Sequence, residues 1–166
     1  MLLLMVLLTL KVATCNFNNN SSHTKLNALQ HFLNVYNVNI LFLQEVSIED
    51  FSQIYNYKAY VNVGTDHLET AILTKNSISF ERVEMLPNGR GMSGVYHNTY
   101  FINVYAPSGT NKRKERNDFY QNELPYLFRT LPSQYILGGD FNCVLNKDDT
   151  TGTFQQSSTL QELVKN

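Results

Sequence analysis

The chain has 166 residues, of which 43% are hydrophobic, so it can bury one sizeable core but is too short for two comfortable domains. Its 13 basic and 14 acidic side chains give a formal net charge of −1, which excludes a strongly basic protein that coats nucleic acid. The two cysteines, Cys15 and Cys143, have neither metal-ligand spacing nor a disulfide framework, and we expect both to be reduced and to face the interior. Length and composition therefore predict a single domain over residues 1–166.

The first ten residues are almost all Leu, Met and Val, and two interpretations of them stay open. The run is too short to span a bilayer, which takes about 20 apolar residues, so we expect no stable membrane partner. It is either a signal peptide cleaved near Cys15 or the lead into a buried strand over residues 7–15. No Lys or Arg precedes the run and Lys11 interrupts it, which favours the strand, and a nuclear or cytoplasmic location over secretion.

A strand, a helix and a second strand are predicted at the start of the chain. The first strand ends in Asn16, and the second, over residues 38–43, runs into Gln44 and Glu45. Between them, apolar residues at three- and four-residue intervals predict a helix that starts near Ser22; they are Leu26, Leu29, Phe32, Leu33 and Tyr36. Such a crossover makes the two strands parallel, so their C-terminal ends share the sheet edge where open α/β proteins bind ligands. Asn16 and Glu45 should therefore meet there.

The middle of the chain predicts short strands joined by turns. After a short helix over residues 47–55, strands are predicted over residues 57–63, 70–74, 78–83, 92–96 and 100–105, with a loop over 87–91 and a tight turn at 97–99. Their spacing indicates antiparallel hairpins. The last of these strands ends in Tyr105, a third polar side chain at a strand end, for which a buried tyrosine with a satisfied hydroxyl is the alternative interpretation.

A helix over residues 111–131 begins with Lys112, Arg113, Lys114 and Arg116, and Pro125 is expected to kink it. Cations at the start of a helix oppose its macrodipole, so they indicate an external anion such as a phosphate backbone, although a solvated charged turn has the same sequence. The helix leads into a strand that starts at Tyr135, which gives a second crossover, and a last helix is predicted over residues 157–164.

The strand that starts at Tyr135 ends in two glycines followed by Asp140-Phe141-Asn142. Residues two apart on an extended chain point to the same side, so Asp140 and Asn142 should lie together, with Phe141 turned into the core. A carboxylate and an amide fixed side by side can orient a water molecule or hold a metal-bound phosphate. An ordinary turn, in which Asp and Asn are common, is the alternative.

Together, the four strand ends resemble those of the endonuclease/exonuclease/phosphatase superfamily, which includes pancreatic-type deoxyribonuclease and the apurinic-site repair endonucleases. The matching segments are Ala13-Thr14-Cys15-Asn16-Phe17-Asn18, Leu43-Gln44-Glu45-Val46, Asn103-Val104-Tyr105-Ala106-Pro107 and Gly138-Gly139-Asp140-Phe141-Asn142. The chain most resembles the endonuclease domain of non-long-terminal-repeat retrotransposons, because Asn-Val-Tyr-Ala-Pro-Ser-Gly, a basic helix and Gly-Gly-Asp-Phe-Asn follow one another.

The resemblance implies a four-layer α/β sandwich, in which two packed mixed β-sheets carry helices on the outside. It also implies an Mg²⁺-dependent or Mn²⁺-dependent phosphodiesterase that nicks DNA to leave a 3′-hydroxyl, which a reverse-transcriptase domain further along a full-length protein could extend. The family's later Asp and its Ser-Asp-His motif do not follow in this chain, so we expect the domain to be incomplete at its C-terminus. A catalytically inactive remnant and a secreted nuclease or phosphatase of the same superfamily stay open as alternatives.

The resemblance also assigns roles to individual residues. Glu45 would ligate Mg²⁺ together with Asp140, and Asn16 would steady the metal site and contact the scissile phosphate. Tyr105 would donate a hydrogen bond to a phosphate oxygen, while Asp140 would orient or deprotonate the attacking water with the support of Asn142. Further contacts to DNA are expected from four residues, which are Asn18, Ser108, Arg113 and Arg116.

Overall fold

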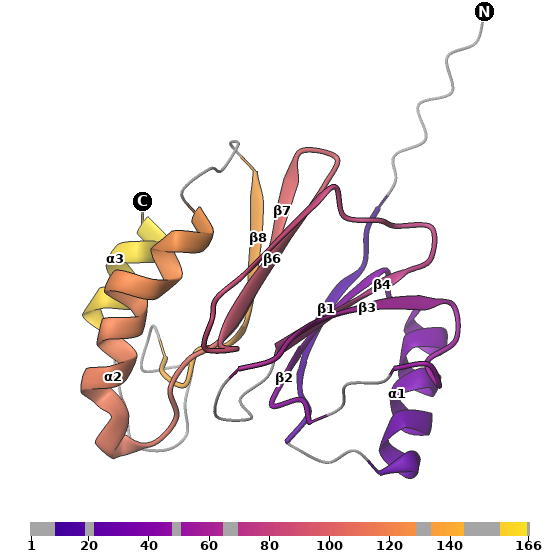
Figure 1. Ribbon diagram of the computed structural model, residues 1–166, viewed down its shortest axis with the longest axis horizontal. Helices are drawn as coiled ribbons and strands as arrows, with labels where there is room; N and C mark the ends of the chain where they lie inside the picture. Colours follow the sequence, from indigo (N-terminus) through magenta and orange to yellow (C-terminus); the bar gives the residue numbers. More distant parts are fainter. Residues whose placement is uncertain are drawn as a thin grey trace, which may run out of the picture.

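Two mixed β-sheets of four strands each pack face to face, and helices cover their outer faces (Figure 1). The computed structural model describes residues 9–18, 22–47, 51–64, 70–128, 134–144 and 157–165. In this part of the chain, α1 lies against the outer face of one sheet, and α2 and α3 lie against the outer face of the other. The predicted four-layer α/β sandwich is confirmed.

The first sheet has the strand order β1–β2–β4–β3. Its members are β1 (Val12–Asn16), β2 (Ile40–Gln44), β3 (Tyr57–Asn62) and β4 (Thr70–Lys75). β1 and β2 are parallel, with Asn16 opposite Gln44, and α1 (His23–Tyr36) connects them. α1 ends at Asn37, whose left-handed φ of 53° is a conformation that Asn tolerates at a helix end. The predicted crossover therefore brings the C-terminal ends of both strands to one edge.

The second sheet has the strand order β5–β6–β7–β8 and also contains a parallel pair. Its members are β5 (Arg82–Met85), β6 (Gly91–Tyr96), β7 (Thr99–Tyr105) and β8 (Tyr135–Asp140). β5, β6 and β7 pair antiparallel, as the hairpin spacing predicted, whereas β7 and β8 are parallel and place Tyr105 opposite Asp140. The second crossover is confirmed, and it brings two further strand ends to one edge.

The connection from β7 to β8 is a series of short helical segments instead of one helix over residues 111–131. It consists of η1 (Thr110–Lys112), α2 (Arg113–Asp118), the π-helical η2 (Phe119–Glu123) and the 3-10 helix η3 (Leu124–Phe128). Pro125 has no backbone N–H to donate to the preceding turn, so a regular α-helix cannot continue there. Residues 129–131 lie outside the described part, and α3 (Ser158–Lys165) matches the predicted last helix.

Apolar side chains fill the space between the sheets and the space beneath the helices. Ile40, Phe42, Met92 and Phe101, each at most 1% exposed, pack between the two sheets. A second cluster lies beneath α1, and a third lies beneath α2, η2 and α3. β2 is buried along its whole length because both of its faces are covered, which explains the apolar run before Gln44.

Several sequence-based expectations differ from the structure. Of the helix predicted over residues 47–55, residues 48–50 lie outside the description and residues 51–55 form turns. The strand predicted over residues 78–83 begins only at Arg82, because Ile78 turns into the inter-sheet core, where it is 3% exposed. The first strand begins at Val12, and Cys15, expected in the interior, is exposed because β1 is an edge strand. Among the described residues, no helix is both long and apolar enough to cross a membrane.

Candidate active site

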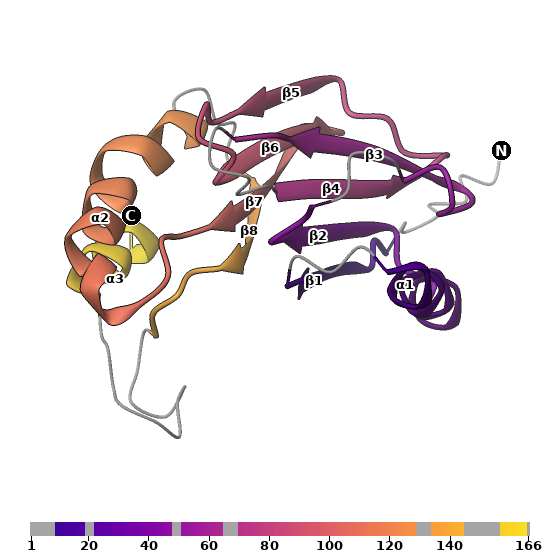
Figure 2. The same ribbon diagram turned by 60° about the horizontal axis from the view of Figure 1, so that its bottom comes forward.

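Four strands end at the same place in the molecule. In the first sheet, parallel β1 and β2 end at Asn16 and Gln44, and in the second, parallel β7 and β8 end at Tyr105 and Asp140. The sheets pack so that these edges adjoin, and the ends of β1, β2 and β8 lie close together in Figure 2. Side chains that are far apart in the sequence are thereby brought into hydrogen-bond contact.

The amide of Asn16 joins the two acids predicted for the site. Its Nδ2 donates one hydrogen bond to Glu45 Oε1 at 2.9 Å and another to Asp140 Oδ2 at 3.0 Å. The two carboxylate oxygens therefore lie no farther apart than the sum of these distances, about 6 Å. The backbone N–H of Asn18 donates to Asn16 Oδ1 at 2.8 Å, and this bond orients the amide so that its nitrogen faces the acids.

Three of the predicted site residues have left-handed backbones, which are uncommon outside glycine. Their φ angles are 53° at Asn18, 51° at Glu45 and 49° at Asn142. Each residue comes just after the end of a strand, where the chain turns away from its sheet. For Glu45, which lacks the short side chain that eases this conformation in Asn, the cost is about 1–3 kcal/mol, and strain of this kind concentrates at functional sites.

The loop after β8 is fixed by hydrogen bonds around Asp140. Asp140 Oδ1 accepts from the backbone N–H of Asn142 at 3.0 Å, and the Asn142 side chain donates to the Ala106 carbonyl at 2.8 Å. The Ala106 N–H in turn donates to the Asp140 carbonyl at 2.8 Å. Gly139 has a φ of 135°, and a Cβ there would lie 2.0 Å from the Val104 carbonyl oxygen, so only glycine fits directly before this acid.

Tyr105 is buried, with 4% of its surface exposed, and its hydroxyl hydrogen-bonds with Glu45 and Ser108. Burial raises the pKa of Tyr105 above its usual value of 10.0, and the negative charge of Glu45 raises it further. The hydrogen bond with Ser108 and the positive charge of Arg90 lower the pKa in part, but the net shift is upward. The phenol is therefore protonated at neutral pH and can donate a hydrogen bond.

Arg90 is a site residue that the motifs did not reveal. Its guanidinium carbon lies 5.7 Å from the centre of the Tyr105 ring, and its side chain is only 13% exposed. Nη2 lies 3.4 Å from Glu115 Oε1, whereas Nη1 is buried and has no hydrogen-bond partner among the described residues. The positive charge of Arg90 therefore lies beside the phenol of Tyr105, whose pKa it lowers in part. The signal in the sequence was Gly89-Arg90-Gly91, which leads into β6, the strand that pairs with β7.

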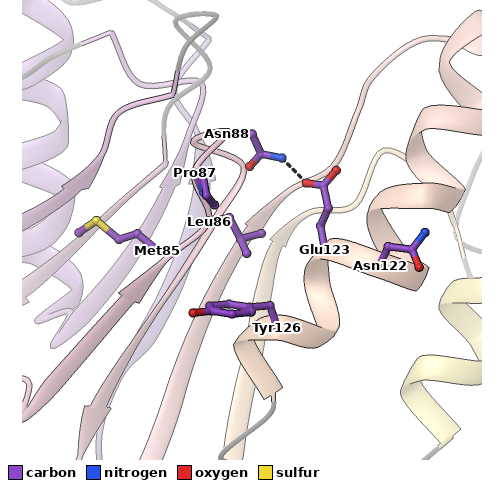
Figure 3. A pocket seen from close by; sticks show the side chains of 7 residues that line it. All are labelled: Met85, Leu86, Pro87, Asn88, Asn122, Glu123 and Tyr126. Carbon is purple, nitrogen blue, oxygen red and sulfur yellow. Dashed lines mark hydrogen bonds between the residues drawn. The ribbon is translucent and has the colours of Figure 1, made fainter.

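The loop that carries Arg90 also forms one wall of a cavity of about 520 Å³ (Figure 3). Glu123 and Tyr126 of the helical segment form the opposite wall, and Glu123 accepts a hydrogen bond from Asn88 across the cavity. The residues that line the cavity include none of the four strand ends. This cavity is therefore separate from the candidate active site.

The sequence profile of the Endonuclease/Exonuclease/phosphatase family matches residues 13–157, which is most of the chain. This chain belongs to that family. Solved structures with a similar fold include truncated TDP2 from Caenorhabditis elegans (TM-score 0.62, 21% identity), TDP2 from D. rerio complexed with a single-strand DNA product (0.64, 18%) and an AP endonuclease from Archaeoglobus fulgidus (0.64, 18%). These matches cover 87%, 81% and 87% of this chain and 65%, 61% and 62% of the others, so the chain spans less than two thirds of each. No curated protein sequence matches the chain.

The donor atoms gathered in this member of the endonuclease/exonuclease/phosphatase family fit a hard divalent cation. Glu45 and Asp140 supply carboxylate oxygens on neighbouring strand ends, joined through Asn16. Among the described residues, no group of three or more His, Cys, Asp or Glu side chains gathers, so water would complete the coordination. Mg²⁺ prefers carboxylate oxygens and commonly keeps several waters, which suits this donor set.

Three of the four residues expected to contact DNA are open to solvent. The side chains of Asn18 and Ser108 are exposed beside Asn16 and Tyr105 respectively, and Arg113 is exposed at the start of α2. Their expected contacts to DNA stay predictions.

Arg116 requires a correction. It is only 3% exposed, and its Nη1 donates to the carbonyls of Pro107 and Gly109 at 2.8 Å and 3.1 Å. A guanidinium buried in this way holds the loop after β7 in place and cannot reach a phosphate backbone outside the protein. The structure gives Arg116 this supporting role in place of the expected contact to DNA.

Proposed function

We propose that this protein is a divalent-metal-dependent phosphodiesterase that nicks DNA and leaves a 3′-hydroxyl. The observation that carries the proposal is the hydrogen-bonded group of Asn16, Glu45 and Asp140 beside Tyr105. A pair of acids that can hold a cation, a protonated phenol and a nearby guanidinium charge can together stabilise the charge that develops in phosphodiester hydrolysis. The family match and the D. rerio TDP2 structure, which contains a single-strand DNA product, support DNA as the substrate.

Each side chain has a distinct part in this reaction. Glu45 and Asp140 would hold Mg²⁺ or Mn²⁺, which offsets the negative charge that develops on the phosphoryl group. Asp140 accepts a proton from the attacking water or orients it, while the N–H of Asn142 fixes the Oδ1 of this carboxylate. The Tyr105 phenol would exchange its hydrogen bond with Glu45 for one to a phosphate oxygen, and the Arg90 guanidinium beside the phenol would add positive charge there.

Nicking of supercoiled plasmid DNA in Mg²⁺, compared with the same reaction in EDTA, tests the proposal. The parent should produce open-circular DNA only in Mg²⁺. Glu45→Gln keeps the shape of the side chain but removes its charge, and should slow nicking by at least about 100-fold. Glu84→Gln is the matched control, because Glu84 lies in β5, where it pairs with Arg82 at 3.4 Å, and this variant should nick like the parent. Equal rates for Glu45→Gln and the parent would refute the assignment of this site.

The ends of the nick test the second half of the proposal. A DNA polymerase should extend the nicked plasmid directly, because a 3′-hydroxyl is the end that it uses. Extension that requires prior treatment with a phosphatase would show a 3′-phosphate and would contradict this product.

We also propose that the chain derives from the endonuclease domain of a non-long-terminal-repeat retrotransposon and acts with a reverse-transcriptase domain in the nucleus or cytoplasm. The support for this is the succession of motifs alone, from Asn103 to Gly109, through the basic segment, to Gly138 and Asn142. The genomic sequence that follows the codon for Asn166 tests it. A frame that continues through Ser-Asp-His into a reverse transcriptase is expected, and a frame that continues into an unrelated enzyme would contradict it.

A further inference from the structure

Two buried amides lie directly behind the acids of the candidate active site. Gln44 and Asn103 are 1% and 0% exposed, and Gln44 Nε2 donates to Asn103 Oδ1 at 2.7 Å. The two residues belong to different sheets, since Gln44 ends β2 and Asn103 lies in β7. This hydrogen bond therefore crosses the inter-sheet core, where apolar side chains such as Phe42 and Phe101 pack.

The alternation of side chains along the strands explains this placement. Gln44 comes two residues after Phe42, and Asn103 comes two residues after Phe101, so both amides are on the strand faces that pack between the sheets. Each is also the last inward-facing residue before a site residue, because Glu45 follows Gln44 directly and Tyr105 follows Asn103 by two positions. The amide pair thus lies at the end of the core nearest the acids.

The side chain of Asn103 makes three hydrogen bonds to the opposite sheet. Its Nδ2 donates to the backbone carbonyls of Leu43 at 2.8 Å and Ala71 at 2.9 Å, which belong to paired residues of β2 and β4. Gln44 also hydrogen-bonds with Thr14 in β1, with its Nε2 3.1 Å from Thr14 Oγ1. One side chain of the second sheet is therefore tied to the strands that deliver Asn16 and Glu45.

Stability alone does not account for these amides. Replacing both partners of a buried hydrogen bond by apolar groups of the same shape is often neutral or stabilising. Apolar packing is non-directional, however, so it does not by itself fix how far one sheet is displaced along the other. Hydrogen bonds of 2.7–2.9 Å do fix that displacement, and here they fix it beside the acids.

We propose that Gln44 and Asn103 are positioning residues that set the distance between the strand ends carrying Glu45 and Tyr105, and so set the affinity of the site for a divalent cation. This inference rests on the proposed function, because it needs a cation site at Glu45 and Asp140. The pair contacts neither cation nor substrate and acts through the main chain of β2 and β7.

Binding of Mn²⁺ to the protein, followed through the electron paramagnetic resonance signal of free Mn²⁺, tests this role without measuring activity. Gln44→Met, Asn103→Leu and the double variant keep the side-chain volumes but remove the amide pair. All three should weaken Mn²⁺ binding by about 10-fold, as loss of a supporting residue typically does. The single variants should also have a lower Tm, because each leaves an amide unpaired, whereas the double variant should regain only part of that loss, because the Leu43 and Ala71 carbonyls still lack their donor.

Thr74→Val is the matched control for a purely structural effect. Thr74 is 0% exposed and its hydroxyl donates to the Ile78 carbonyl at 3.0 Å, and it lies at the other end of β4 from the site. This variant should have a lower Tm with unchanged Mn²⁺ affinity. The double variant should instead weaken Mn²⁺ binding, at a Tm no lower than that of Asn103→Leu.

The outcomes separate the two proposals. Mn²⁺ affinity equal to that of the parent in the double variant, with Glu45→Gln losing binding, would overturn the positioning role and leave the metal site standing. Unchanged binding by Glu45→Gln would refute the metal site itself and with it both proposals. If the single variants fail to fold, the double variant, in which both amides are replaced, still tests the positioning role.

Discussion

At the scale of single residues, Asn16 holds the carboxylates of Glu45 and Asp140 close together. Their bonded oxygens are at most about 6 Å apart, a separation at which like charges repel each other. The neutral amide of Asn16 offsets only part of this repulsion. A divalent cation between the two carboxylates would attract both of them. This pair of acids is therefore better suited to binding a metal ion than to a purely structural role.

Added Mg²⁺ should therefore stabilise the folded protein. With an affinity near 1 mM, about 10 mM Mg²⁺ would add about 1.4 kcal/mol to the free energy of unfolding and raise Tm by about 3–6 °C. Thermal unfolding in Mg²⁺ and in EDTA checks this, with Glu45→Gln as the variant that should not respond. The same rise in Tm for Glu45→Gln would place the bound ion elsewhere.

Arg90 provides a second prediction at this scale. Lys is a shorter, point-like cation that cannot reproduce a planar guanidinium stacked on Tyr105, so Arg90→Lys should lower kcat/KM for DNA cleavage by about 10- to 100-fold without unfolding the protein. Arg82→Lys is the control, because Arg82 of β5 lies over the ring of Tyr100 at a similar separation of 5.3 Å, and Tyr100 is at the opposite end of β7 from Tyr105. Full activity of Arg90→Lys would exclude a contact between this guanidinium and the substrate.

The two glycines before Asp140 differ in how replaceable they are. Gly139→Ala should lower the free energy of unfolding by at least about 2 kcal/mol, because its φ is 135° and the new Cβ would clash with the Val104 carbonyl. Gly138→Ala should cost less, since its Cβ would meet only the Phe42 ring at 3.0 Å, which can shift. Urea unfolding of both variants measures the difference, and equal stabilities would contradict the strained backbone.

At the scale of elements, the helical segment between β7 and β8 holds the loop after Asp140 in place. The Tyr120 hydroxyl of η2 donates to the Phe141 carbonyl and lies 3.2 Å from Cys143 Sγ. π-Helical turns such as η2 are rare and occur frequently at functional sites. Here η2 carries Tyr120, which is 1% exposed and contacts the residues directly before and after Asn142.

Tyr120 predicts how stability depends on alkaline pH. Burial raises the pKa of Tyr120 far above its usual value of 10.0, so the folded protein keeps this proton where the unfolded chain releases it. Above about pH 10 the unfolded chain then binds fewer protons, and the free energy of unfolding falls as pH rises. Tyr120→Phe should make this fall shallower while lowering stability by about 1 kcal/mol at pH 8.

Urea unfolding between pH 8 and about pH 11 checks the prediction for Tyr120. Tyr55→Phe serves as the control, because Tyr55 is 70% exposed, and it should leave the pH dependence unchanged. An equally steep fall in Tyr120→Phe would assign the alkaline transition to other groups.

At the scale of the whole molecule, the weak net charge of −1 limits how DNA can be held. Arg113 and Lys114 are exposed at the start of α2, just after the loop that follows Tyr105. A protein with so few cations near its site neutralises few phosphates, and it depends on local contacts rather than on its overall field. In the reaction proposed above, this arrangement would also favour release of the nicked product.

Binding to DNA should accordingly depend weakly on salt. A plot of the logarithm of the binding constant against the logarithm of salt concentration should have a slope of about −2 to −3. The double substitution Arg113→Ala and Lys114→Ala should make this slope less negative by about 1–2. Fluorescence anisotropy in EDTA measures both slopes. Lys58→Ala in β3 is the control, since Lys58 is exposed on the other sheet and bonds to Ser79. A slope near −6 would indicate an extended DNA-binding surface.

Both crossovers and the polar strand ends could be predicted from the sequence because their signals are local. Apolar runs, helical spacing and the residue that ends each run are read along one segment at a time, and parallel pairing then brings Asn16 to Glu45 and Tyr105 to Asp140. The helix expected over residues 51–55 and the strand expected from Ile78 were wrong because tertiary packing overrode local propensity.

The sequence by itself determined which residue types end the strands and which strands are parallel. Only the tertiary structure decided that Arg90 faces Tyr105, that Arg116 is buried under a loop and that Gln44 bonds Asn103 between the sheets. Each of these contacts joins residues from different segments that no helical or strand periodicity relates, so no pattern along the sequence predicts the contact. Such contacts exist only once two independently patterned sheets have packed, because packing selects which polar groups must find partners away from water.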